Sequence, residues 1–240
     1  MRLGENVHVT IHLDDLAEAL PFYQGIGYRL VRQAERPAPS VLLSDGVVLV
    51  QLEQDEKPFQ GLTYYTANLA ERLEHLERVG VTFTEITMKG ERPASALFYD
   101  LNGCGVRLVA ADPEALPRPE GNSFSECGKF GEFSIPTRDL KTSLAFWENL
   151  GFTRTDGDDA EPYPWAFIKD GLIAVGLHQT DDFSVIMLSY FAQDMVERIA
   201  RLKAAGMPFV WERKNEQGQS IHGRIQAPDG QSFFLFLGEV

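Results

Sequence analysis

The strongest constraint on the fold is a segment that recurs four times along the chain. In each copy an Asp or Asn precedes a stretch whose apolar residues share one helical face, and a glycine follows the Asp or Asn by 12 positions. Asp and Asn cap helix N-termini, and glycine suits the left-handed position after a helix. The predicted helices lie within residues 15–27, 68–80, 139–151 and 194–206.

Each predicted helix lies in the same order of extended segments. One strand-like run precedes it, residues 7–13 in the first copy, and three follow. The last two runs meet at a dipeptide that is a strong signal for a β-hairpin. These dipeptides are Asp45-Gly46, Asn102-Gly103, Asp170-Gly171 and Asp229-Gly230. The chain therefore predicts an α+β fold of four βαβββ modules, with a local distortion at Pro21 inside the first helix.

The modules group in pairs along the chain. Residues 44–54 resemble residues 169–179, which matches the first module with the third. Residues 113–128, between the second and third modules, are rich in proline and glycine and are typical of a linker. The sequence predicts a first domain of modules one and two at 1–112, and a second domain of modules three and four at 129–240.

Charge and cysteine content limit the classes of partner. The 240 residues carry a net charge of −13, which opposes binding to nucleic acid or anionic membranes and weakly favours a cationic ligand. Cys104 and Cys127 are too few for a disulfide scaffold. Because we find no secretory leader and no apolar run of membrane-spanning length, we expect a cytoplasmic protein. A monomer and a homodimer both stay open.

Two segments of the chain resemble a known superfamily. HVTIHLDDLAEALPFYQGIGYRL and FSIPTRDLKTSLAFWENLGFTRT each have a strand, an Asp-Leu or a close equivalent, a helix with an aromatic pair, and a glycine-aromatic step. The pairs are Phe22-Tyr23 and Phe146-Trp147, and residues 227–230 resemble the Asp-Pro-Asp-Gly turn before the last strand. The chain thus resembles vicinal oxygen chelate proteins, which include glyoxalases, bleomycin-resistance proteins and extradiol dioxygenases. The resemblance implies two tandem glyoxalase-like incomplete barrels, each around a cavity.

The same resemblance places metal ligands on particular strands. Those positions hold His8, Gln51, Leu62 and Arg107 in the first domain, and Glu132, Gly176, Leu188 and Phe234 in the second. A catalytic divalent metal takes about three protein ligands. Leucine, glycine and phenylalanine side chains offer none, and arginine has no lone pair to donate. The His-His-Glu pattern of extradiol dioxygenases is also absent. We therefore expect no metal and no other cofactor.

Strand alternation predicts which side chains face the cavities. On the first strand His8, Thr10 and His12 share the face opposite the valines. We predict that the second domain forms the better cavity, and that Arg107 fills the first one or pairs with Glu53. The candidate ligand-binding residues are Glu132, Ser134, Trp165, His178, Tyr190, Tyr64, Thr10, Gln51 and Arg107.

Three functions fit these patterns. The leading one is a protein that binds a small organic molecule in a barrel cavity without a metal, similar to bleomycin-resistance proteins. The second is a metal-independent lyase, isomerase or hydrolase of the same superfamily, with His8, His12 and Glu53 as candidate acid–base groups. The third is an interaction protein whose cavities no longer function.

Overall fold

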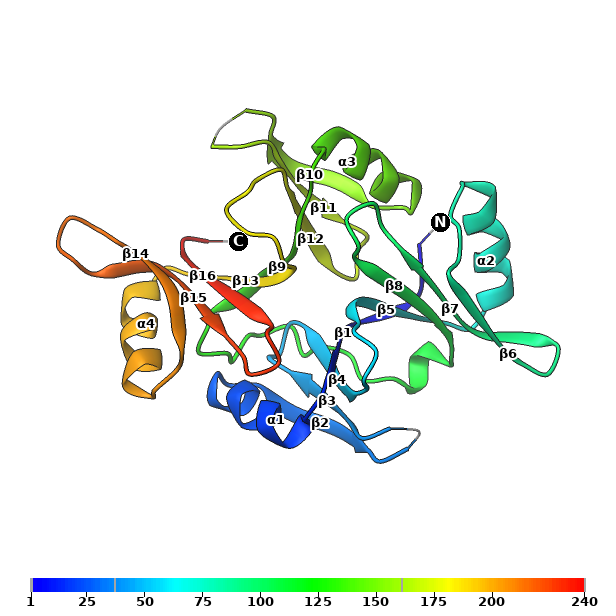
Figure 1. The fold of residues 1–240 in the computed structure, drawn as a ribbon, viewed down its shortest axis with the longest axis horizontal. Helices are drawn as coiled ribbons and strands as arrows, with labels where there is room; N and C mark the ends of the chain where they lie inside the picture. Colours follow the sequence, from blue (N-terminus) through cyan, green and yellow to red (C-terminus); the bar gives the residue numbers. More distant parts are fainter. Residues whose placement is uncertain (1, 37, 161, 240) are drawn as a thin grey trace. The chain divides into compact units, whose positions relative to one another are not determined.

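Two eight-stranded sheets and four α-helices make up the computed structural model, which describes residues 2–36, 38–160 and 162–239 (Figure 1). The strand order is β2-β3-β4-β1-β5-β8-β7-β6 in the first sheet and β10-β11-β12-β9-β13-β16-β15-β14 in the second. Both orders begin and end on edge strands, so neither sheet closes into a barrel. The α+β fold of four βαβββ modules is confirmed, because each sheet contains two copies of the same order.

The bounds of the elements follow the predicted repeat. The first sheet contains β1 (Asn6–Leu13), β2 (Arg29–Ala34), β3 (Ser40–Ser44), β4 (Leu49–Gln54), β5 (Gln60–Thr66), β6 (Glu85–Lys89), β7 (Arg92–Tyr99) and β8 (Gly105–Ala110). The second contains β9 (Lys129–Pro136), β10 (Thr153–Asp158), β11 (Trp165–Lys169), β12 (Ala174–His178), β13 (Met187–Ala192), β14 (Phe209–Lys214), β15 (Ser220–Gln226) and β16 (Ser232–Leu237). A short 3-10 helix, η1 (Pro113–Ala115), follows the first sheet.

The helices are α1 (Leu16–Gly25), α2 (Leu69–Arg78), α3 (Leu140–Asn149) and α4 (Met195–Ala204). The predicted caps form at two of them: Asp15 accepts hydrogen bonds from the amides of Ala17 and Glu18, and Asp139 accepts one from Thr142. The prediction is wrong for α2 and α4, where the backbone of Asn68 and Asp194 leaves the extended conformation that aims a capping side chain.

Helix α1 runs through Pro21 without interruption. The glycines after α1 and α3 have φ of +97° and +95° at Gly27 and Gly151, the left-handed conformation that the spacing predicted. In the described part of the chain no helix is long and apolar enough to span a membrane.

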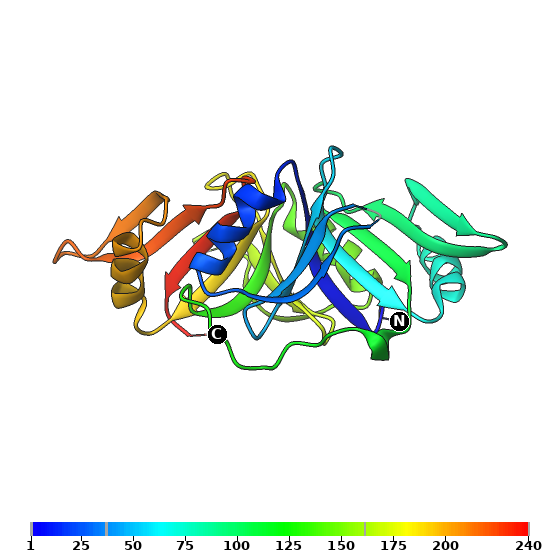
Figure 2. The same cartoon turned by 90° about the horizontal axis from the view of Figure 1, so that it is seen from below.

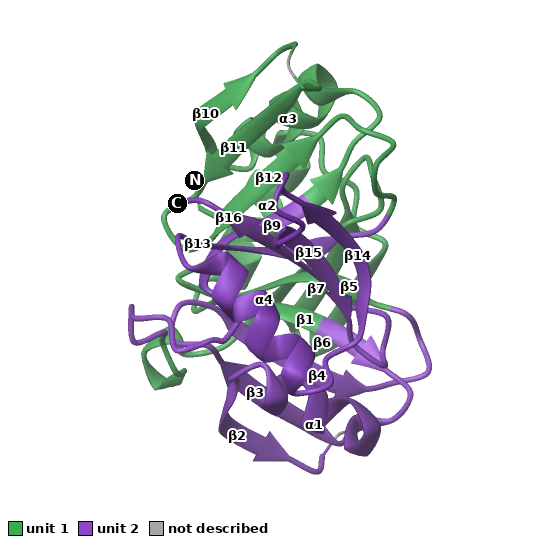
Figure 3. Ribbon diagram, turned by 90° about the vertical axis from the view of Figure 1, so that its left-hand side faces the viewer, with its two compact units in different colours: residues 1–10, 59–118, 135–184 green, residues 11–58, 119–134, 185–240 purple. Residues whose placement is uncertain are grey.

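The chain forms two compact units that combine modules from both sheets (Figure 3). Unit 1 contains residues 1–10, 59–118 and 135–184, so it holds most of modules two and three. Unit 2 contains residues 11–58, 119–134 and 185–240, so it holds most of modules one and four. The predicted domain boundary at 113–128 stays a prediction.

Each helix covers one face of the strands of its own module. In unit 2, α4 lies against β15 and β16 and buries Met195, Ile199 and Leu202 (Figures 1 and 2). In unit 1, α2 buries Leu69, Leu73 and Leu76 against β7 and β8, as its apolar spacing predicted. The opposite faces of these strands carry the side chains considered below as candidate sites.

An aspartate in three of the four hairpin turns links the modules within a unit. In unit 1, Asp170 Oδ2 accepts a hydrogen bond from the Tyr64 hydroxyl at 2.7 Å, and Asp100 Oδ2 accepts one from the Trp147 indole at 3.2 Å. In unit 2, Asp229 Oδ2 accepts one from the Tyr23 hydroxyl at 2.8 Å. The other oxygen of each carboxylate accepts turn amides, such as that of Gln231 at 2.8 Å. These contacts join residues of neighbouring modules that lie far apart in sequence.

We expect the free energy of unfolding to rise as the pH is lowered from neutral toward about 4. Burial raises the pKa of Asp45, Asp100 and Asp229 above the usual value, against hydrogen bonds from the turn amides. The folded state therefore binds more protons than the unfolded state between about pH 4 and the raised pKa values, so stability falls as pH rises through that window.

Other carboxylates set the acid limit of this trend. Hydrogen bonds lower the pKa of Asp194 and Glu212, through Arg198 and Lys203 respectively, and their stabilisation is lost as pH falls through the lowered values. Urea unfolding at pH 5, 6 and 7 tests the trend. Asp45→Asn is expected to flatten the slope, whereas Asp159→Asn, an exposed carboxylate, leaves it unchanged; an equal slope in wild type and Asp45→Asn contradicts the assignment.

Candidate functional site

In unit 1, the face of the first sheet opposite its helices carries a small polar cluster. Thr10 Oγ1 on β1 donates to Thr63 Oγ1 on β5 at 2.8 Å, and both side chains are buried. His8 lies two residues before Thr10, and its ring is 4.7 Å from that of Tyr65 between centroids. The predicted alternation on β1 is therefore correct for His8 and Thr10, and the cluster adds Thr63 and Tyr65.

Arg107 fills space on the same face. It lies on β8 directly across from Thr63 in the parallel β5–β8 pair. Its guanidinium packs over the Phe59 ring at 4.4 Å from the centroid, a cation–π contact. This packing agrees with the predicted space-filling role, whereas the predicted pair with Glu53 stays a prediction.

In unit 2, the structure brings together His12 on β1 and Glu53 on β4, two of the candidate acid–base residues. His12 Nε2 is 3.0 Å from Glu53 Oε2, and His12 Nδ1 is 2.8 Å from the Lys57 carbonyl oxygen. Both partners are acceptors, so the ring satisfies both contacts only when each nitrogen carries a proton. His12 borders a pocket of about 300 Å³ whose lining includes Asp14, Glu18 and Asp55. Gln51 lies two residues before Glu53 on the same strand.

The second sheet carries a hydrogen-bonded chain in unit 2. Ser134 Oγ donates to Glu132 Oε1 at 2.7 Å and is 2.6 Å from Ser189 Oγ. Glu132 and Ser189 are also direct neighbours across the β9–β13 pair. All three side chains are buried. The structure thus unites Glu132 and Ser134, as predicted, and adds Ser189.

Beyond Ser189, four aromatic rings form a continuous surface, which we call the aromatic face: Phe191, Trp211, Phe234 and Phe236. Phe234 and Phe236 stack at 4.4 Å between centroids with an interplanar angle of 14°. Phe191 stacks on Phe236 at 5.2 Å, and Trp211 lies 5.2 Å from Phe234. Trp211 is 42% exposed, and the three phenylalanines are half-buried.

Three nitrogen-bearing side chains border the aromatic face. Arg224 on β15 lies directly across from Phe234 on β16 and Trp211 on β14. Its Nε is buried and has no hydrogen-bond partner within the described residues. His222 lies across from Phe236 and Arg213. These positions put two arginines and one histidine around the rings.

The protonation of His222 follows from its contacts. Its Nδ1 accepts a hydrogen bond from the Leu237 amide at 3.2 Å. Burial lowers the pKa of His222, and the charge of Arg213 lowers it further. The ring is therefore neutral at pH 7, and its single proton is on Nε2. His222 presents an N–H donor beside the Phe236 ring, which lies 5.5 Å away between centroids.

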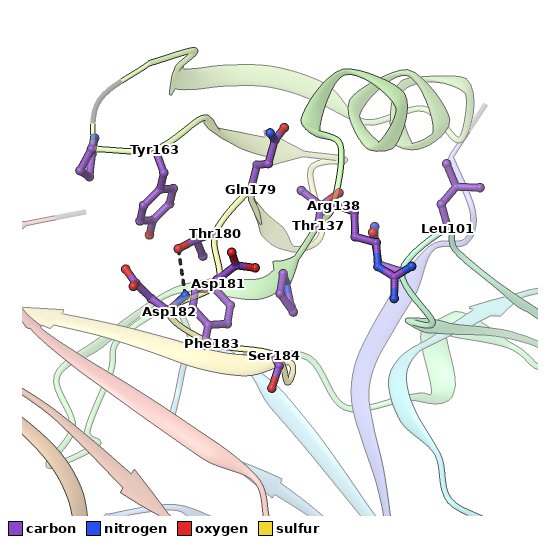
Figure 4. A pocket seen from close by; sticks show the side chains of 13 residues that line it. Leu101, Thr137, Arg138, Tyr163, Gln179, Thr180, Asp181, Asp182, Phe183 and Ser184 are labelled. Carbon is purple, nitrogen blue, oxygen red and sulfur yellow. Dashed lines mark hydrogen bonds between the residues drawn. The ribbon is translucent and has the colours of Figure 1, made fainter.

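In unit 1, Trp165 and His178 are brought together across the β11–β12 pair. Phe167 and Gly176 are the next pair on the same face, so the predicted alternation is correct here. The Tyr163 hydroxyl is 3.3 Å from His178 Nδ1. Tyr163 also lines a pocket of about 870 Å³ at this end of the unit, together with Arg138 and Asp181 (Figure 4).

Two predicted site residues lie elsewhere. Tyr64 and Tyr190 were expected to face the cavities, but both have the opposite orientation on their strands. Tyr64 is buried against Asp170, and the Tyr190 hydroxyl forms a hydrogen bond with that of Tyr28. The prediction is wrong because the assignment of β5 and β13 was one residue out of register, which exchanges the two faces of a strand.

The corrected register also changes the set of residues at the metal positions. Thr63 and Ser189, in place of Leu62 and Leu188, share faces with Thr10 and Ser134. In the second sheet the positions then hold Glu132, Gly176, Ser189 and Phe234. One carboxylate among these residues does not fit the ligand set of a catalytic divalent metal. Within the described residues, no group of three or more His, Cys, Asp and Glu side chains is placed to hold a metal ion.

The aromatic face was missed from the sequence. Its signal was present, because the alternation of Ser189 and Phe191 on β13, and of Phe234 and Phe236 on β16, places all four on one face. Arg224 and His222 alternate in the same way on β15. The register between the three strands was not available from the sequence.

Comparisons with solved structures identify the architecture. A catechol 2,3-dioxygenase matches with a TM-score of 0.61 and 14% identity over 98% of this chain and 87% of its own. A 2,3-dioxygenase from Pseudomonas sp. KL28 matches with a TM-score of 0.61 and 13% identity over 97% and 91%. An extradiol ring-cleaving dioxygenase from B. fuscum matches with a TM-score of 0.66 and 13% identity over 100% and 73%.

No family model and no curated protein sequence matches the chain. At 13–14% identity the structural matches establish the fold and leave the activity open. The match extends over nearly the whole chain, which agrees with the resemblance of its strand–helix segments. The chain therefore has the four-module, two-sheet fold of these dioxygenases.

Proposed function

We propose that this protein binds a small planar organic anion on the aromatic face of unit 2, without a metal. The observation that carries the proposal is Arg224. Its Nε is buried without a hydrogen-bond partner among the described residues, yet it lies beside stacked aromatic rings. Leaving a buried donor unsatisfied costs about 1–3 kcal/mol, and an anionic ligand removes that cost.

The aromatic face supports a planar ligand. The rings of Phe191, Phe234 and Phe236 are half-buried and nearly parallel, and Trp211 adds an exposed indole at one end. Such a surface favours offset stacking of a further ring. The bound ring then lies within reach of the neighbouring strand β15, which carries the polar groups.

The charge around the face supports an anion. The net charge of −13 favours a cationic ligand in general, but Arg213 and Arg224 reverse the local sign. Neutral His222 offers its Nε2–H as a donor to a ligand. Its Nδ1 offers no acceptor, because it already accepts a hydrogen bond from the Leu237 amide. Glu132 accepts a hydrogen bond from Ser134 and is buried.

The test is calorimetric titration of the full chain with three probes of one ring size: 2-naphthoate, 2-naphthylmethanol and 2-naphthylmethylammonium. We expect 2-naphthoate to bind most tightly. Arg224→Gln is expected to weaken its binding by about tenfold or more, because a charge-assisted hydrogen bond is lost. Arg118→Gln, which changes an exposed arginine outside this face, is the matched control.

The metal part of the proposal is tested in the same titration. We expect 2-naphthoate affinity to be unchanged after dialysis against a chelator, and elemental analysis to find well under one divalent metal per chain. Tighter binding of the ammonium probe, or full affinity in Arg224→Gln, contradicts the anion site. Loss of binding with chelator and recovery with Fe²⁺ or Mn²⁺ contradicts metal independence.

The alternative, a metal-independent enzyme, has one supporting observation. His12 and Glu53 form a close pair beside the pocket of about 300 Å³. However, both ring nitrogens already contact acceptors, so His12 serves as a proton acceptor only after that pair is broken. Turnover of a bound probe that disappears in His12→Gln, with binding retained, would favour the enzyme.

A further inference from the structure

The pocket of about 870 Å³ in unit 1 shares no lining residue with the aromatic face of unit 2, and the proposed function does not use it. Its walls come from the β7–β8 turn, the turn between β9 and α3, the segment before β11 and the segment after β12 (Figure 4). The volume is in the range of pockets that hold small organic ligands, about 300–1,000 Å³.

Opposite charges line this pocket without pairing. Arg138 precedes the helix cap of α3, while Asp181 and Asp182 follow β12. No ion pair within 4.0 Å joins Arg138 to either aspartate or to any other carboxylate of the described residues. Figure 4 shows the Arg138 side chain on one side of the pocket and both aspartates on the other. Each charge is therefore available to a ligand.

The aspartate side of the pocket is also aromatic. Tyr163 and Phe183 line it, and His178 lies between them, with centroid distances of 5.9 Å to Tyr163 and 5.6 Å to Phe183. Aromatic rings beside carboxylates favour an organic ammonium group, because ring quadrupole and carboxylate attract the same charge. The arginine side favours a carboxylate, which matches the guanidinium geometry.

We propose that this pocket binds a small organic zwitterion. The ammonium end lies against Asp181, Asp182 and Tyr163, and the carboxylate end lies against Arg138. A ligand with only a positive charge is repelled by the Arg138 guanidinium. A ligand with only a negative charge is repelled by the carboxylates of Asp181 and Asp182. Only a ligand that carries both charges is attracted by both sides.

The test is calorimetric titration of the full chain with ω-amino acids from glycine to 6-aminohexanoate, each compared with the fatty acid and the alkylammonium of the same chain length. We expect saturable binding of at least one ω-amino acid, with at least tenfold higher affinity than either singly charged analogue. No saturable binding across the series, or equal binding of the acid or the amine alone, overturns the proposal.

Variants separate the two ends of the site. Arg138→Gln is expected to lower the affinity for the ω-amino acid by about tenfold, which is about 1.4 kcal/mol. The weak binding of the alkylammonium is expected to stay unchanged. The double variant Asp181→Asn/Asp182→Asn is expected to weaken the binding of both the ω-amino acid and the alkylammonium. Arg118→Gln and Asp159→Asn, exposed charges outside the pocket, serve as controls. Because 2-naphthoate binding at Arg224 is measured separately, failure of one site does not imply failure of the other.

Discussion

Replacement of Trp147 by alanine is expected to lower the free energy of unfolding by about 3–5 kcal/mol, the range for a large aromatic residue removed from a core. Trp147 on α3 is 0% exposed, and its ring meets Phe152 edge-on at 4.9 Å between centroids. The substitution also removes the indole donor to Asp100, whose carboxylate is buried in the adjacent module of unit 1. The loss of packing and of the hydrogen bond act in the same direction.

Two further variants separate these causes. Trp147→Phe retains a ring and loses the donor, so we expect a cost of about 1–3 kcal/mol. Trp211→Ala removes a tryptophan that is 42% exposed, and we expect a smaller cost than for Trp147→Ala. The measurement is urea unfolding followed by circular dichroism. A loss in Trp147→Ala no greater than that in Trp211→Ala contradicts the assigned role.

Replacement of Gly61 by alanine is expected to destabilise the protein by about 3 kcal/mol or more, at the upper end for overpacking. Gly61 on β5 faces Gly105 on β8, and a Cβ at Gly61 would lie 1.9 Å from the Gly105 carbonyl oxygen. Backbone atoms cannot rotate away as a flexible side chain does, so the two strands must separate. That movement also displaces Thr63 and Arg107, which are opposed two positions further along these strands.

Gly90→Ala is the matched control for this substitution. Gly90 has a φ of +65°, and a Cβ there meets no atom within 4 Å. Its cost is limited to the left-handed backbone conformation, about 1–2 kcal/mol. Soluble yield and the urea midpoint of both variants are compared. Equal midpoints would show that β5 and β8 accommodate the extra carbon.

Local signals predicted the elements well where neighbouring residues alone determine them. Asp15 and Asp139 cap their helices because a carboxylate in extended backbone reaches amides two or three residues ahead. Asp194 has the same residue type and spacing but bonds Arg198 at 2.7 Å, a partner that competes with the cap. The aromatic face shows the same limit, because its strand alternation is local but the register of β13, β15 and β16 is not.

The sequence by itself determined the four βαβββ modules, since helical spacing, capping residues and turn dipeptides act over fewer than about 15 residues. Only the tertiary structure decided which side chains of β5 and β13 lie on each face of the sheet. Tyr64 forms a hydrogen bond with Asp170, and Tyr190 forms one with Tyr28, and both partners belong to other modules. It also decided that Arg224 lies beside stacked rings and that Arg138 and two aspartates line the same pocket. These relations depend on strand register and on packing between distant segments, which no local pattern specifies.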